Sequence, residues 1–251
     1  MAKNEKVVTE AGALTPFSVS QAGALTPFSV SQAGALTPSA VSQAGALTPS
    51  ATPTLDYYNR NSGKFTVSTV DVEFTDIQDW FLKYLEPGAL ILDFGCGSGR
   101  DSKYFLSKGY KVEACDGSEE MVRIASETAG IPVRRMLFEE LSEVERYDGI
   151  FACASILHVP YAGLSDILAR VERALKTGGI LYVSFKYGTF EGERNGRYFT
   201  DMTMERLEEC LKACGGENAG SKLEIVESRI TGDVRPGRGD EKWLNVILRK
   251  R

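Results

Sequence analysis

Three alternating glycines follow an acidic residue in the run that extends from Asp93 to Gly99, Asp-Phe-Gly-Cys-Gly-Ser-Gly. An apolar strand is expected to end at Asp93, and a helix is expected to begin near Arg100. Glycines let a ligand approach the backbone, and the free N–H groups of the first helical turn point toward it. A dinucleotide fingerprint would require glycine at position 100, where arginine stands. The run therefore predicts a nucleotide or nucleoside site of another kind.

A second acidic residue lies in register with this turn. The run 111–115 reads as a strand that ends in Asp116, about 20 residues after Gly95. A carboxylate at this place accepts hydrogen bonds from both hydroxyls of a ribose. Ser118 then caps a helix, with Met121 in its first turn. An ordinary doubly wound domain with a glycine turn is the alternative.

Together these residues resemble motif I and the following acidic position of the class I S-adenosylmethionine (SAM) methyltransferases. The resemblance implies that SAM is the cofactor and that Met121 packs on the adenine. Leu137 stands where many relatives carry an acid for the adenine amino group, so recognition there would rest on backbone groups and on Phe138. The cofactor-binding residues implied are Asp93, Gly95, Cys96, Gly97, Gly99, Asp116, Gly117, Met121, Leu137, Phe138, Cys153 and Ala154.

The elements that must position these residues alternate along the chain. Strands are expected near 90–94, 111–115, 132–136, 148–153 and 179–185, and helices near 76–85, 100–108, 118–129, 162–175 and 203–214. Residues 56–64 read as a short helix or loop. The runs 222–231 and 242–249 are too close to pair other than antiparallel. The predicted fold is α/β: a doubly wound, Rossmann-like, mostly parallel sheet, seven-stranded by the resemblance, closed by an antiparallel C-terminal hairpin.

Residues 11–54 are a tandem repeat of an 11-residue unit with a proline at the sixth position of every copy. Proline would interrupt a helix in every copy, and the unit has few large apolar groups to bury. We therefore expect residues 1–54 to be a disordered extension and residues 55–251 to be the methyltransferase domain. A partner-binding arm is the alternative for the repeat.

The segment after the fourth strand carries His158, the only histidine of the chain. Ligands of open α/β sheets bind beyond the carboxyl ends of the strands, so His158 is a candidate general base, with a structural role as the alternative. The remaining candidates for contact with the acceptor are Tyr58, Arg100, Lys186, Tyr187, Arg194, Arg197, Arg235 and Arg238. Guanidinium groups suit a carboxylate or phosphate, although solvated loop charges would give the same pattern.

Composition limits the partners. The 251-residue chain has a net charge of −5, which argues against a nucleic-acid partner. Its five cysteines lack zinc-site spacing, so no metal is expected, and their odd number favours reduced thiols. No stretch of 18 apolar residues predicts a membrane span, and we expect a cytoplasmic protein. The expected reaction is in-line SN2 methyl transfer to a small, anionic acceptor. RNA or protein methylation, and a non-catalytic SAM-binding or interaction protein, are the alternatives. The acceptor and the oligomeric state are not predicted.

Overall fold

The computed structural model describes residues 51–214, 220–235 and 237–251. All of these belong to one of the two units into which the chain divides, residues 44–251. The other unit, residues 1–43, lies outside the described residues. The prediction that the repeat is disordered therefore concerns, as far as residue 50, a part of the chain that the structure does not describe.

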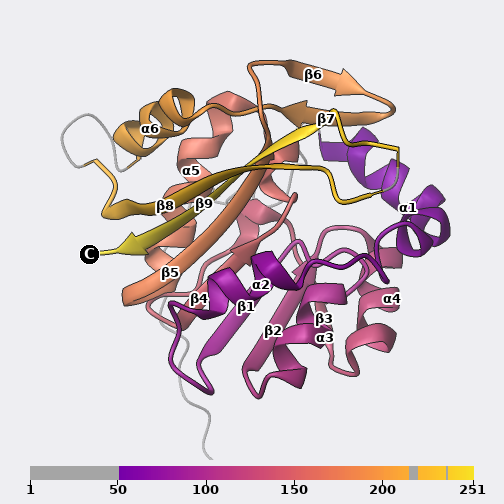
Figure 1. Cartoon of the computed structure of the whole chain (residues 1–251), viewed down its shortest axis with the longest axis horizontal. Coiled ribbons are helices and arrows are strands. Elements are labelled where there is room, and N and C mark those ends of the chain that lie inside the picture. The colour runs from indigo at the N-terminus through magenta and orange to yellow at the C-terminus, as the bar shows by residue number, and fades with distance from the viewer. Residues whose placement is uncertain (1–50, 215–219, 236) are drawn as a thin grey trace, which may run out of the picture. The chain divides into compact units, whose positions relative to one another are not determined.

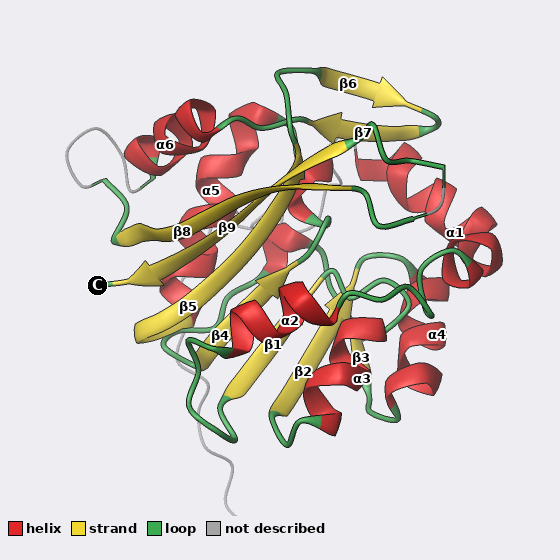
Figure 2. Cartoon of the chain, in the orientation of Figure 1, coloured by secondary structure: helices red, strands yellow, loops and turns green. Residues whose placement is uncertain are grey.

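A seven-stranded sheet forms the centre of the described unit, with strand order β3-β2-β1-β4-β5-β9-β8 (Figures 1 and 2). Its parallel part consists of β1 (Leu90–Phe94), β2 (Lys111–Asp116), β3 (Val133–Arg135), β4 (Tyr147–Ala152) and β5 (Leu175–Lys186). The hairpin of β8 (Leu223–Gly232) and β9 (Lys242–Lys250) is antiparallel, and β9 pairs with β5. The predicted α/β sheet and its closing hairpin are confirmed.

Helices cover both faces of this sheet because successive residues of a strand point to opposite sides. Ile91 and Phe151 pack under α2 (Thr75–Leu82) and α3 (Arg100–Ser107), in a cluster that includes Phe81 and Phe105. The neighbouring residue Leu92 belongs to the other cluster, with α5 (Tyr161–Ala174) and α6 (Met204–Ala213). Helix α4 (Glu119–Ala129) begins at the Ser118 cap, which accepts from the Met121 N–H. The doubly wound arrangement therefore follows from the apolar strands.

Helix α1 (Ala51–Val67) differs from the expectation of a short helix or loop. Its first turn contains residues 51–54, which we had assigned to the disordered extension, and this assignment is corrected for these four residues. The helix contacts α4 and β7 (Arg197–Thr200), and tertiary packing therefore stabilises a segment that the repeat pattern marks as unstructured.

A second hairpin, β6 (Glu191–Arg194) with β7, was not predicted. Its turn is Asn195-Gly196, and both residues have positive φ, 55° and 75°. This dipeptide is a strong signal for a two-residue hairpin, so the signal was present in the sequence. The β6–β7 hairpin is a two-stranded sheet of its own, separate from the seven-stranded sheet that contains β8 and β9 (Figure 1). None of the described helices is long and apolar enough to cross a membrane.

Candidate active site

The glycine turn after β1 forms the floor of a cavity at the carboxyl ends of the strands. Gly95 and Gly97 have φ of 82° and 55°, where other residues are strained. A Cβ on Gly95 would lie 2.5 Å from the Ser155 Cβ. A Cβ on Gly99 would lie 2.9 Å from the Ala125 backbone, and Gly99 is not among the residues that line the cavity. Gly99 therefore allows α3 to pack on α4, while Gly95 and Gly97 face the ligand space.

Asp116 joins the end of β2 to this turn. Its carboxylate accepts hydrogen bonds from the Gly97 N–H and the Ser118 N–H, both at 2.9 Å. Burial raises its pKa from 3.8 to about 6, against the lowering effect of these N–H groups. The carboxylate lines the cavity. It is therefore placed to accept hydrogen bonds from a ligand on the glycine turn.

An apolar wall continues from Asp116 along the cavity, and it consists of Gly117, Met121, Leu137 and Phe138. Met121 is buried, and Phe138 packs edge-on against Phe94 with ring centroids 4.9 Å apart. The Leu137 N–H donates to the Glu140 carboxylate at 2.7 Å, so this backbone donor is already engaged. The wall offers packing surface for a flat ring.

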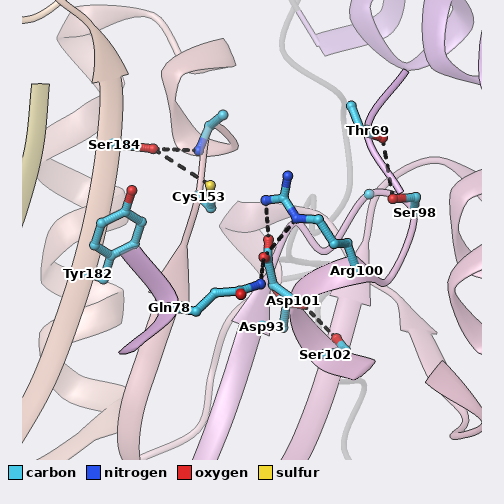
Figure 3. Close-up of polar contacts among 12 residues, drawn as sticks. Thr69, Gln78, Asp93, Ser98, Arg100, Asp101, Ser102, Cys153, Tyr182 and Ser184 are labelled. Carbon is cyan, nitrogen blue, oxygen red and sulfur yellow. Dashed lines mark hydrogen bonds and ion pairs between the residues drawn. The ribbon is translucent and has the colours of Figure 1, made fainter. Parts of the chain in front are cut away.

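Arg100 is the first residue of α3, and it lies in a network of polar side chains beside the cavity (Figure 3). Its guanidinium makes two hydrogen bonds with Asp101, at 2.9 and 3.0 Å, and Asp101 also accepts from the Gln78 amide at 2.6 Å. Asp93 accepts from the Ser102 hydroxyl at 2.5 Å, and burial with the nearby Asp101 charge raises its pKa to about 8. Asp93 does not line the cavity. Asp93 therefore connects the end of β1 to α3, on either side of the glycine turn.

Cys153 and Ala154 follow β4 and also line the cavity. The Ala154 N–H donates to the Ser184 hydroxyl at 2.8 Å, and Ala154 has the uncommon φ of 49°. Burial raises the pKa of the Cys153 thiol to about 12. Cys153 is therefore a neutral wall residue at physiological pH.

His158 lines the cavity with both ring nitrogens engaged. Nδ1 lies 2.5 Å from the Tyr198 carbonyl oxygen, and Nε2 lies 3.0 Å from the Tyr58 hydroxyl. Since a carbonyl only accepts, Nδ1 carries the proton and Nε2 accepts from Tyr58. Burial lowers the pKa of His158 to about 4. The imidazole is therefore neutral, and it contacts the cavity beside the Tyr58 hydroxyl.

Four further cationic candidates reach the cavity: Lys186, Arg197, Arg235 and Arg238. Lys186 forms an ion pair with Glu241, Arg235 with Asp233, and Arg238 lies 3.9 Å from Glu241.

Two of the predicted acceptor contacts lie elsewhere. Arg194 pairs with Asp201 at 2.8 Å, and Tyr187 is 43% exposed; neither lines the cavity. Arg194 therefore serves the β6–β7 hairpin, although it is only three residues from Arg197.

Several cavity residues were missed by sequence reasoning. They come from α1, from the segment that follows it and from the C-terminal half of the chain: Thr54, Leu55, Phe65, Thr69, Val72, Phe74, Phe199, Trp243 and Asn245. No local motif marks them, because they reach the cavity through packing of distant segments. Within the described part of the chain, no group of three or more His, Cys, Asp or Glu residues could hold a metal ion.

Comparison with known proteins agrees with this geometry. A methyltransferase domain family matches residues 91–179. An uncharacterized methyltransferase from Staphylococcus carnosus is 27% identical over 58% of this chain and 75% of its own length. The ribosomal protein L11 methyltransferase from Campylobacter lari is 29% identical over 50% of this chain, but only 45% of its own length is covered. The chain thus spans about half the length of this relative.

The chain carries a methyltransferase domain, and its fold is that of SAM-dependent methyltransferases of known structure. A crystal structure of 1,6-didemethyltoxoflavin-N1-methyltransferase from Burkholderia thailandensis, with 1,6-didemethyltoxoflavin and S-adenosylhomocysteine bound, shares the fold with a TM-score of 0.63. Identity is 22%, over 83% of this chain and 92% of that one. The cavity fits SAM: Gly95 and Gly97 line it with backbone alone, Asp116 presents a carboxylate, and the wall of Met121 and Phe138 is apolar.

Proposed function

We propose that this methyltransferase transfers the methyl group of SAM to a small, anionic acceptor. The observation that carries the proposal is one continuous cavity, with the glycine turn and Asp116 in its lining together with cationic residues from β7 and the β8–β9 loop. SAM supplies a methyl group activated by its sulfonium. The protein then contributes mainly proximity, alignment and exclusion of water.

The cofactor half of the proposal rests on three features. Asp116 would accept from the ribose hydroxyls, and Met121 and Phe138 would pack on the adenine. The Cys153–Ala154 segment follows the strand next to β1, so it would border the sulfonium. These are the contacts that we expect when SAM is bound.

The acceptor half rests on the enclosure of the cavity. Leu55 and Phe65 of α1 line it from one side, and Phe199 and Trp243 line it from strands late in the chain. Such walls suit a small molecule better than an RNA or protein chain, as does the net charge of −5. The relative named for ribosomal protein L11 keeps protein methylation as the rival within the enzyme class.

A base is available only in an indirect form. Because Tyr58 donates to the His158 Nε2, a proton from the acceptor would reach the imidazole through the Tyr58 hydroxyl. We propose this route for an alcohol, amine or thiol acceptor. His158→Ala should then lower kcat and change the pH profile; an unaltered kcat would leave His158 with a structural role.

The test is calorimetry of the full chain with SAM and S-adenosylhomocysteine, followed by labelled SAM with metabolite pools, RNA and protein as acceptors. Gly97→Arg should abolish cofactor binding because its side chain fills the turn next to Phe65. Gly109→Arg is the matched control, since Gly109 also has positive φ, 84°, but no neighbour within 4 Å of a built Cβ. Binding of NAD in place of SAM, or turnover on RNA or protein alone, would contradict the proposal.

A further inference from the structure

The cationic side chains that line the cavity differ in whether a carboxylate lies near them. Five cationic side chains line it, and four of them have a carboxylate within 4 Å: Arg100, Lys186, Arg235 and Arg238. Among the residues that the structure describes, Arg197 has no carboxylate partner at this distance. Within the described part of the chain, its side-chain nitrogens make a single hydrogen bond, a long one of 3.4 Å from Nη1 to the Tyr58 hydroxyl oxygen. Arg197 thus brings a positive charge to the cavity without a matching acid.

Arg197 is also a polar group that the protein leaves unsatisfied. Its Nε is buried and has no hydrogen-bond partner among the described residues. An unpaired buried donor is costly, and charged donors are the most costly. An acidic ligand that accepts from the terminal Nη groups of the same guanidinium would offset this cost.

The position of the guanidinium is fixed by aromatic rings. Its carbon lies 4.5 Å from the ring centroid of Tyr57, 5.1 Å from Phe199 and 5.8 Å from Tyr58. The Asn195-Gly196 turn places the start of β7 against α1, because a Cβ on Gly196 would lie 3.3 Å from Tyr57. Arg197 is therefore preorganised by contacts that neutralise no charge.

The surroundings indicate the chemistry of the ligand. A guanidinium presents a planar fork that matches a carboxylate with two parallel hydrogen bonds. A phosphate dianion would bring a second negative charge, and among the described residues no second unmatched cation lines the cavity. Aromatic rings of Tyr58, Phe65, Phe199 and Trp243 provide apolar contact for a flat body.

We propose that Arg197 anchors the carboxylate of a flat, aromatic acceptor, and that it is the residue that selects a monoanionic acid. This inference rests on the proposed function and names its acceptor class. Arg194, in the same hairpin, is already paired with Asp201 and provides a matched control.

The experiment uses the full chain saturated with S-adenosylhomocysteine. Calorimetry measures binding of benzoate and trans-cinnamate, of the matching amides benzamide and cinnamamide, and of phenyl phosphate. The carboxylates should bind at least about tenfold tighter than their amides, as expected for charge-assisted pairing. Arg197→Met should abolish this preference, Arg197→Lys should keep part of it, and Arg194→Met should keep all of it. Affinity for S-adenosylhomocysteine should be equal in all four proteins.

The inference would be overturned by the absence of a preference for carboxylates over amides in the wild type, by a preference that survives in Arg197→Met, or by tighter binding of phenyl phosphate than of the carboxylates. A selective loss of S-adenosylhomocysteine affinity in Arg197→Met would also overturn it, because Arg197 would then serve the cofactor. Failure of the wild type to bind S-adenosylhomocysteine is a different outcome, since it contradicts the proposed function itself. Melting temperatures of the variants separate these results from loss of folding.

Discussion

At the scale of single residues, Asp116 makes cofactor binding sensitive to pH. Burial raises its pKa from 3.8 to about 6, so the carboxylate becomes protonated as the pH falls through 6. The charged form is the better acceptor for ribose hydroxyls. We expect calorimetry at pH 7.5, 6 and 5 to show progressively weaker SAM binding. Asp116→Asn should weaken binding by about 1–3 kcal/mol at pH 7.5 and flatten the pH dependence. If the affinity for SAM does not change between pH 7.5 and pH 5, the role of Asp116 is contradicted.

His158 gives a second pH effect, on stability. Its pKa is lowered in the folded chain from 6.5 to about 4, chiefly by burial. Below pH 6.5 the unfolded chain binds a proton that the folded chain does not, so folding stability is lost as the pH falls from 6.5 toward 4. The raised pKa values of Asp93 and Asp116 act in the opposite sense, so the His158 contribution is isolated by comparing urea unfolding of the wild type and His158→Asn at pH 7 and 5. His158→Asn keeps a donor for the Tyr198 carbonyl and cannot titrate, so its unfolding free energy should change more favourably from pH 7 to pH 5 than that of the wild type; an equal change in both proteins would assign the effect to other groups.

At the scale of elements, Gly99 ties the glycine turn to the packing of α3 on α4. Gly99→Ala would place a Cβ at positive φ and 2.9 Å from the Ala125 backbone. Gly109→Ala is the control, because Gly109 has a similar φ of 84° and open space around its Cβ. We expect the control to lose about 1 kcal/mol of unfolding free energy, and Gly99→Ala to lose more, up to about 3 kcal/mol. Equal losses in urea unfolding would show that the turn alone requires glycine.

The elements that could be predicted are those with a local cause. The apolar run of β1, the Ser118 cap of α4 and the spacing of Asp116 are fixed within a few residues of sequence, and the structure confirms them. The β6–β7 hairpin also had a local signal, in Asn195-Gly196, which was overlooked among polar neighbours. Helix α1 had none, because its stability depends on packing against α4 and β7.

The same distinction separates the two halves of the site. The cofactor half follows from one contiguous motif and the strand after it. In the acceptor half, Tyr58 and His158 are hydrogen-bonded although 100 positions separate them, and no spacing rule links them. Sequence composition also treats Arg194 and Arg197 as equal loop charges. The two residues are opposite each other in the hairpin and both contact the Phe199 ring, yet Arg194 pairs with Asp201 whereas Arg197 lines the cavity, and this difference depends on tertiary neighbours.

At the scale of the whole molecule, the division between extension and domain can be tested by truncation. Helix α1 contributes Thr54, Leu55 and Tyr58 to the cavity, and the Thr54 hydroxyl accepts from the Tyr198 N–H at 3.0 Å. Deletion of residues 1–50 removes none of these contacts. We therefore expect that chain to keep the SAM affinity and melting temperature of the full protein.

Deletion of residues 1–54 should behave differently, because it removes the first turn of α1 and the hydrogen bond that holds β7. We expect a lower melting temperature and weaker SAM binding than in the 1–50 deletion, measured by calorimetry and thermal unfolding of the two chains side by side. If the 1–50 deletion already loses cofactor affinity, the extension contributes to the site and the proposed boundary fails. If it changes only the oligomeric state, the repeat acts as the partner-binding arm that the sequence left as the alternative.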